Sequence, residues 1–165
     1  ITRKIYSKRK LPIRKKEIYK YGLSRCPFNQ QSVAFKKSTI EDCGGYITWH
    51  NNEDYFLWIR AIYFSKGINF INLKKPLVIA HVDNKSFLRR GGIKYFASEI
   101  SIRIYLYSNN LISLTELLKG ICIRFIIQII VPNKLRVYLY KYILRRFWTI
   151  CTKKYIQLEC LIAYT

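Results

Sequence analysis

The sequence predicts an α/β fold followed by basic amphipathic helices, and its character changes near Asn109. Before that point, short segments rich in Ile, Val and Phe alternate with longer segments of helical period, and Gly, Pro and Asn separate them. After it, nine Lys or Arg and no acidic residue lie between Glu116 and Glu159. We therefore expect an α/β domain over residues 1–109 and a basic helical region over residues 110–165.

Length and composition favour one folded domain. The chain has 165 residues, of which 50% are hydrophobic and 16% aromatic, so a core can form and disorder is excluded for most of the chain. Thirty Lys and Arg oppose nine Asp and Glu, and the net charge of +21 attracts polyanions. The five cysteines include no Cys-x-x-Cys pair, which argues against a disulfide framework or a zinc cluster and favours reduced thiols in the cytosol.

The sequence pattern predicts neither a membrane span nor a secretory signal peptide. Its longest uncharged, largely apolar run covers eight residues, 125–132, whereas a bilayer span needs about 20. The basic N-terminus is followed by LPIRKKEIYK rather than by an apolar block. The chain has no Met, even at position 1, which suggests the downstream piece of a longer protein.

The first elements are short. Nine of the first twenty residues are Lys or Arg, which is typical of a solvated arm. Residues 14–21 predict a helix that Gly22 ends, and residues 32–35 predict a strand. Ser38 is then expected to cap a short helix, with Glu41 as its capping-box partner.

The middle of the chain predicts two helices and two strands. A helix is expected from Glu53 to Lys66, because acids occupy its first turn and Gly67 follows it. Segments 68–73 and 76–82 are rich in Ile and Val, which favours two strands. The segment from Gly92 through Tyr107 then has a helical pattern.

The basic region predicts two further helices. Residues 117–131 are apolar nearly all the way round, so this helix should be buried or lie on something apolar. Pro132 breaks it, and KLRVYLYKYILRR begins a second helix with one apolar face.

The best-marked group of candidate functional residues is GGYITWHNNEDYFLW, residues 44–58. Glu53 and Asp54 open an aromatic-rich helix, and acids at this position stabilise a helix by about 0.3–1 kcal/mol without any catalytic role. A functional role is the alternative, because the Gly44–Gly45 pair lets the backbone approach a ligand. The aromatic residues that could line a sugar or base pocket are Trp49, His50 and Trp58.

Four segments resemble the C-terminal half of bacterial family 2 glycosyltransferases that build surface polysaccharide and lipopolysaccharide. They are PFNQQSVAFKKSTIEDCGGY, NNEDYFLWIR, FLRRGGIKYFASE and VPNKLRVYLYKYILRR. The resemblance runs from about Arg14 to Arg146, and its most specific part is the Gly-Gly-Tyr followed by Glu-Asp and an aromatic helix. It implies a GT-A fold, of which residues 1–109 would be the acceptor side, and inverting transfer of a sugar from a nucleotide donor to a glycan or lipid-linked acceptor hydroxyl.

The resemblance also implies residue roles. The second carboxylate of the family's Glu-Asp motif is the general base, which falls on Asp54 beside Glu53. The leaving nucleoside diphosphate needs cations, and Arg89 and Arg90 precede a glycine pair that permits close approach. An exposed basic turn is the alternative for this pair. His81 could ligate a metal, but a single His in an apolar strand is more often packed.

One part of the family pattern is missing. The Asp-x-Asp motif that holds Mg²⁺ or Mn²⁺ beneath the diphosphate belongs to the family's N-terminal half, and the three Asp of this chain are not spaced in that way. We therefore expect a fragment, inactive alone, whose complete enzyme takes the divalent cation.

Two other functions are compatible with the charge. A nucleic-acid-binding protein would use Lys and Arg interleaved with fourteen Tyr, although no helix-turn-helix, zinc or RNP pattern supports specific recognition. A membrane-surface module would use the basic helices on anionic lipid. The second fits the enzyme, which would be cytoplasmic and peripheral at the inner face of the membrane.

Overall fold

The computed structural model describes residues 11–78, 89–139 and 158–164. The described helices and strands, in chain order, are α1 Lys15–Gly22, the 3₁₀ turn η1 Gln30–Ser32, β1 Val33–Phe35, α2 Lys37–Asp42, α3 Glu53–Tyr63, β2 Asn69–Val78, α5 Ile93–Ser108, α6 Leu114–Phe125, the π-helical turn η2 Ile126–Ile130, α7 Asn133–Tyr138 and β3 Leu158–Tyr164. This mixture confirms the α/β class. Most of the predicted N-terminal arm, His81 and the predicted last helix beyond residue 139 lie outside the described residues.

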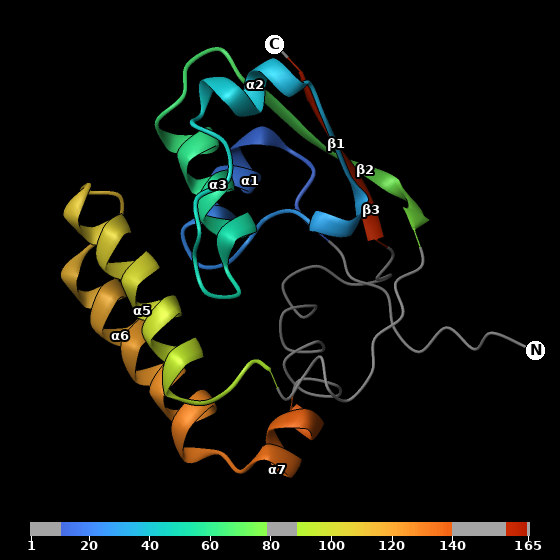
Figure 1. The fold of residues 1–165 in the computed structure, drawn as a ribbon. Helices are drawn as coiled ribbons and strands as arrows, with labels where there is room; N and C mark the ends of the chain where they lie inside the picture. The colour runs from blue at the N-terminus through green and yellow to red at the C-terminus, as the bar shows by residue number, and fades with distance from the viewer. Residues whose placement is uncertain (1–10, 79–88, 140–157, 165) are drawn as a thin grey trace, which may run out of the picture.

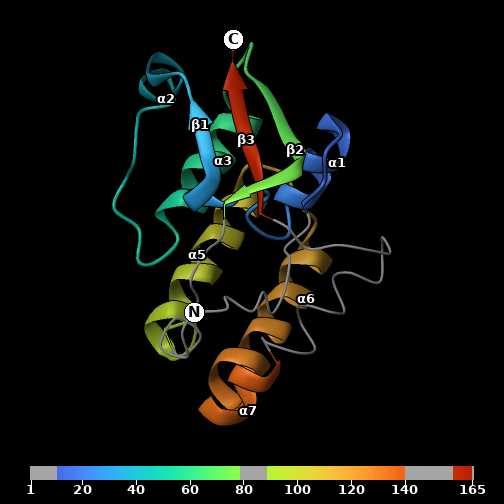
Figure 2. The ribbon, with the colours of Figure 1, turned by 90° about the vertical axis from the view of Figure 1, so that its right-hand side faces the viewer.

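Within the described residues, the sheet has three strands in the order β1-β3-β2. Strand β3 runs parallel to β1, with Val33 opposite Leu161, and antiparallel to β2, with Asn69 opposite Tyr164. Helices α1, α2 and α3 lie on one side of this sheet (Figures 1 and 2). The central strand was not predicted, because it comes from the region that we expected to be helical. The division of the chain at residue 109 stays a prediction.

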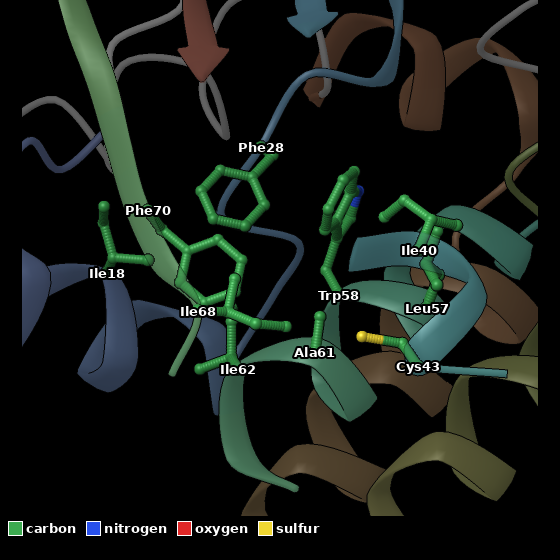
Figure 3. Packing of buried hydrophobic residues seen from close by; sticks show 10 residues of the cluster. All are labelled: Ile18, Phe28, Ile40, Cys43, Leu57, Trp58, Ala61, Ile62, Ile68 and Phe70. Carbon is green, nitrogen blue, oxygen red and sulfur yellow. The ribbon is translucent and has the colours of Figure 1, made fainter. Parts of the chain in front are cut away.

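Helix α3 is the centre of the core. Towards the sheet, Trp58 packs edge-on against Phe28 with ring centroids 5.1 Å apart, and Phe28 stacks on Phe70 at 5.6 Å (Figure 3). On its other side, α3 contributes Tyr55 and Ile59 to a second cluster with α5 and α6. Burial on two sides explains why α3 is hydrophobic nearly all the way round.

Helices α5 and α6 form a hairpin whose long axes lie side by side (Figure 1). A capping box begins α6: the Ser113 side chain accepts from the Glu116 backbone N–H, and the Glu116 carboxylate accepts from that of Ser113. The backbone N–H and the hydroxyl of Ser113 both donate to the Glu116 carboxylate, and these two bonds hold the pKa of Glu116 below its usual value. Pro132 follows η2, as predicted, and α7 begins directly after it.

Several boundaries agree with the sequence prediction. Helices α1, α3 and α5 each begin within one residue of the expected position, and β1 begins at Val33 rather than Ser32. The positive φ of Gly67 follows the end of α3, although the last helical residue is Tyr63 rather than Lys66.

Two boundaries differ. Strand β2 is continuous through Pro76, where two strands were predicted, and its pairing with β3 shifts register on both sides of that residue. Proline lacks the N–H of the ladder, so it interrupts pairing without ending the strand. Ser38 is not the cap of α2, because the helix already begins at Lys37, where an ion pair of 3.3 Å joins Lys37 to Glu41.

The apolar helix of residues 117–131 is only partly buried. Leu117 and Gln128 are buried, but Leu118 and Ile126 are about half exposed, and nothing in the described part of the chain covers them. No helix within the described ranges is both long and apolar enough to cross a bilayer.

Replacing the central aromatic of the core should be costly. Trp58 is fully buried, so Trp58→Ala should lower the free energy of unfolding by about 3–5 kcal/mol, measured by urea denaturation. Tyr107→Ala, on the exposed side of α5, is the control and should change the free energy by less than about 1 kcal/mol. Equal effects of the two substitutions would contradict this core.

Candidate functional site

The two predicted carboxylates open α3. Asn52 is the N-cap residue and is buried, Glu53 is exposed, and Asp54 is half-buried. Asp54 Oδ1 accepts a hydrogen bond of 2.7 Å from the backbone N–H of Tyr55. Negative charge at a helix N-terminus is stabilised by the helix dipole, and the bond from Tyr55 fixes the orientation of Asp54.

Arg60, in the third turn of α3, fixes the preceding Gly44–Gly45 turn. Both glycines have positive φ, +79° and +62°, which other residues adopt at a cost. The Arg60 guanidinium donates to the carbonyl of Cys43 at 2.6 Å and to that of Gly45 at 2.5 Å. It also lies over the Phe56 ring, 5.1 Å from the centroid. The start of the 44–58 segment is therefore tied to the helix that carries the carboxylates.

Ser98 of α5 joins the other end of this segment to the helical hairpin. Its hydroxyl donates to the carbonyl of His50 at 2.6 Å and accepts from the Asn52 side-chain amide at 3.0 Å. Its carbonyl accepts from the indole N–H of Trp49 at 3.2 Å. Three of the four residues before the Glu-Asp pair are thus bonded to one residue of α5.

An open hollow of about 460 Å³ lies at this junction. One wall comes from the loop before α3 and the other from the first turns of α5. The residues that line it are Thr48, Trp49, His50, Lys94, Ala97, Ser98 and Ser101. Its volume is within the range of about 300–1,000 Å³ that is usual for small-ligand sites, and an indole beside polar side chains suits a sugar.

The hollow brings together only some of the predicted site residues. Trp49 and His50 line it, as does Lys94, which follows the Arg89–Gly92 turn. Gly44 and Gly45 do not line it but form the turn that Arg60 holds. The side chains of Arg89 and Arg90 are exposed just before α5.

The prediction that Trp58 lines a ligand pocket is wrong. Its ring is fully buried between Phe28 and Phe35, and its indole N–H donates to the side chain of Gln30 at 3.3 Å. Because α3 is buried on two sides, its aromatic residues serve the core. Trp49, which precedes the helix, is the tryptophan that reaches the hollow.

Three residues that line the hollow were not predicted from the sequence: Lys94, Ser98 and Ser101. Lys94 and Ser98 are one turn apart on α5, and Ala97 and Ser101 are likewise one turn apart, so each pair lies on one helix face. A face of small and polar residues on an otherwise apolar helix is the signal that could have indicated them.

Two tyrosines support α3 from the opposite side. The Tyr55 hydroxyl donates to the Gly22 carbonyl at 2.7 Å, and the Tyr63 hydroxyl donates to the Tyr19 carbonyl at 2.5 Å. Burial raises the pKa of both hydroxyls above their ordinary value. Both therefore stay neutral donors at physiological pH and anchor α3 to α1.

The described residues do not fit a divalent-cation site. Within residues 11–78, 89–139 and 158–164, no three His, Cys, Asp or Glu side chains gather closely enough to hold a metal ion. His81 and Asp83 lie outside these ranges.

Comparison with known proteins relates the chain to sugar-transferring enzymes. It is 38% identical over 139 residues to a UDP-Gal:α-D-GlcNAc-diphosphoundecaprenol β-1,3-galactosyltransferase of Escherichia coli, a match that covers 84% of this chain and 49% of the relative. Its curated relatives are bacterial glycosyltransferases. An uncharacterized glycosyltransferase of Haemophilus influenzae is 39% identical over 95 residues, covering 58% of this chain and 34% of the relative.

A third relative is the amylovoran biosynthesis glycosyltransferase AmsE of Erwinia amylovora, 29% identical over 94 residues, which are 57% of this chain and 35% of the relative. The chain spans about half the length of the first relative and about a third of the other two. No protein-family model matches the chain, and no solved structure gives a significant match. These findings confirm the resemblance to glycosyltransferases of surface polysaccharide and give the nucleic-acid-binding alternative no support.

The two hydrogen bonds from Arg60 to the Gly44–Gly45 turn should contribute measurably to stability. Arg60→Ala removes two charge-assisted hydrogen bonds to the Gly44–Gly45 turn, so the free energy of unfolding should fall by about 1.5–3 kcal/mol in urea denaturation. Hydrogen exchange at residues 43–47 should become faster. Lys66→Ala, an exposed cation just after α3, is the control and should change neither quantity. Unchanged exchange in Arg60→Ala would mean that another contact holds the turn.

Proposed function

We propose that the chain is the acceptor-side part of an inverting family 2 glycosyltransferase with GT-A architecture. It would transfer a sugar from a nucleotide-sugar donor to an acceptor hydroxyl during surface-polysaccharide assembly. The observation that carries the proposal is the 38% identity over 139 residues to a galactosyltransferase whose name specifies a nucleotide-linked donor and a lipid-diphosphate acceptor. The position of the carboxylate pair in the chain supports it, because Glu53 opens α3 three residues after His50, which lines the open, sugar-sized hollow. Neither Glu53 nor Asp54 is among the residues that line the hollow.

Asp54 is the proposed general base. Inversion at the anomeric carbon requires the acceptor oxygen to attack on the face opposite the leaving diphosphate, so one carboxylate must take the acceptor proton there. The Tyr55 N–H orients Asp54 at the start of α3, where the helix dipole stabilises negative charge. Positioning therefore contributes more than a raised pKa. Glu53 is exposed next to it and adds a second negative charge at the start of α3.

The hollow is the proposed place for the acceptor sugar. The exposed edge of Trp49 offers an apolar surface for a pyranose ring, and its other contacts fix it: the ring packs against Phe56 at 4.3 Å and its N–H is bonded to Ser98. His50, Lys94 and Ser101 supply polar groups for sugar hydroxyls. Arg89 and Arg90 are the proposed partners of the leaving diphosphate.

The divalent cation is proposed for the complete enzyme only. Mg²⁺ or Mn²⁺ would stabilise charge on the diphosphate there, and an Asp-x-Asp pair would hold it. No residue in the described ranges is assigned to the metal, and no step above depends on it.

Attachment to the cytoplasmic face of the membrane is the proposed location. Exposed apolar side chains gather on α6 and η2, beside the exposed Lys119 and Lys134; they are Leu114, Leu118, Ile123, Phe125, Ile126 and Ile130. A basic surface with half-exposed apolar residues suits an anionic leaflet, where each cation contributes about 1 kcal/mol. Such attachment would hold the hollow near a lipid-linked acceptor.

Substitution of the proposed base tests the mechanism. In a preparation that contains this chain and transfers sugar, Asp54→Asn should lower kcat by roughly 10²–10⁴-fold and leave the KM for the donor nearly unchanged. The matched control is Asp42→Asn, an exposed Asp that also follows a Glu but lies at the end of α2. Near-normal kcat in Asp54→Asn would assign the proton to another residue.

Vesicle sedimentation tests the location. Lys119→Ala combined with Lys134→Ala should weaken binding to anionic vesicles by about 30-fold, since two cations contribute about 2 kcal/mol. The control pair Lys37→Ala and Lys66→Ala, exposed in the N-terminal half of the chain, should have a smaller effect. Equal binding to neutral and anionic vesicles, or tighter salt-sensitive binding to RNA, would contradict membrane attachment.

A further inference from the structure

Arg136, on helix α7, is a buried cation. Its residue is only 4% exposed, and neither of the two ion pairs in the described part of the chain includes it. One guanidinium nitrogen, Nη1, donates to the carbonyl of Gln128 at 3.2 Å, and the other, Nη2, donates to the Asn133 side chain. The third nitrogen, Nε, is buried and has no hydrogen-bond partner among the described residues.

The guanidinium of Arg136 lies against the backbone of Gly91. A Cβ atom added at position 91 would come within 1.9 Å of Arg136 Cζ and within 2.3 Å of both terminal nitrogens. Real atoms cannot approach so closely, so a side chain at this position would displace the guanidinium. The absence of a side chain at Gly91 is therefore what allows α7 to pack against the turn before α5.

One backbone carbonyl, that of Gln128, accepts hydrogen bonds from both the Arg136 side chain and the turn before α5. The Gln128 carbonyl, at η2, accepts a hydrogen bond from the Gly92 backbone N–H at 3.1 Å as well as from Arg136. Gly92 is the N-cap residue of α5. The turn that carries Arg89 and Arg90 is thus fixed to η2 by one hydrogen bond and to α7 by the Arg136 contact.

This arrangement concentrates positive charge at one point. Arg89 and Arg90 are exposed on the turn, Arg136 lies beneath it, and the 16-residue helix α5 starts there with its N-terminus. A buried guanidinium is costly to desolvate, and its Nε remains without a partner. An anion that binds at the turn would offset part of that cost.

We infer that Arg136 is a positioning residue for an anion site formed by Arg89–Gly92 and the N-terminus of α5, and that the ligand is a diphosphate. This inference rests on the proposed function, which supplies the diphosphate. Two vicinal Arg side chains match two phosphate groups. Because the Arg89–Gly92 turn is already held in place before a ligand binds, the entropy cost of binding is lower. The diphosphate is that of the nucleotide donor or that of a lipid-linked acceptor.

Pyrophosphate binding to the full chain, measured by calorimetry, tests the site. Arg136→Ala should weaken binding roughly 10- to 100-fold, because both the fork and the buried charge are lost. Arg136→Lys keeps the charge without the fork and should give an intermediate loss. Lys134→Ala, an exposed cation on the same helix α7, is the matched control and should change the affinity by less than about threefold.

A double substitution separates positioning from general destabilisation. Gly91→Ala should weaken pyrophosphate binding by displacing the guanidinium, although it removes no charge. In the Arg136→Ala background, Gly91→Ala should cost little more, since the atoms that it would displace are gone. Thermal unfolding of each variant checks that the chain remains folded. If the two losses multiply in full, or if Arg136→Ala equals Lys134→Ala, the positioning role is overturned.

Competition identifies the source of the diphosphate. Displacement of pyrophosphate by uridine diphosphate assigns the site to the donor, and displacement by farnesyl diphosphate assigns it to the lipid acceptor. Displacement by neither, or no saturable binding of pyrophosphate to the unmodified chain, overturns the inference. The proposed function fails separately: it fails if Asp54→Asn leaves sugar transfer intact, whatever the pyrophosphate measurements give.

Discussion

The hydrogen bonds of Ser98 are the constraint on which the rest of the site depends. Ser98 lies on α5, and its partners His50 and Asn52 lie just before α3, more than 40 residues earlier in the chain. Through these bonds, the helix that opens with two carboxylates is held against the helix that follows the arginine turn. The hollow exists because the loop and α5 meet there without filling the space between them.

A shortage of acidic residues shapes how this chain uses arginine. With nine acids for thirty Lys and Arg, most of the cationic side chains cannot each have a carboxylate of their own. Arg60, Arg103 and Arg136 instead donate to backbone carbonyls, at Cys43 and Gly45, at Ser24, and at Gln128 respectively. Each of these carbonyls lies in a turn or beside a helix end, so each arginine ties a loop to a helix.

Arg103 and Arg124, between α1 and the α5–α6 hairpin, show the electrostatic cost of placing arginines close together. Arg103 and Arg124 both donate to the carbonyl of Ser24, and Arg124 also forms an ion pair with Glu99. Burial and the nearby Arg124 lower the pKa of Arg103, but a guanidinium remains charged at physiological pH. The Arg103 guanidinium lies against Gly120, much as Arg136 lies against Gly91, so two glycines provide room for one half-buried and one buried cation.

Much of the local structure could be predicted because it depends on near neighbours. Acids before an apolar run place the start of α3, and a glycine or asparagine marks the ends of α1, α2 and α5. The carboxylate pair and the residues Trp49 and His50 were identified in the same way. The predictions that failed concern features that depend on contacts between residues distant in the chain. Trp58 joins the core because α3 is covered on two sides. Strand β3 forms between β1 and β2, which pair with its two edges. Lys94 and Ser101 belong to the hollow only because Ser98 brings α5 to the loop.

A double-mutant cycle between Asn52 and Ser98 tests this account most directly. Asn52→Ala and Ser98→Ala are made singly and together, and the free energy of unfolding of each variant is measured in urea. If Ser98 couples the start of α3 to α5, the two losses should be non-additive, with an interaction energy of about 0.5–3 kcal/mol. Losses that add within about 0.3 kcal/mol would mean that the two helices are held together elsewhere, and would contradict the claim that this junction builds the site.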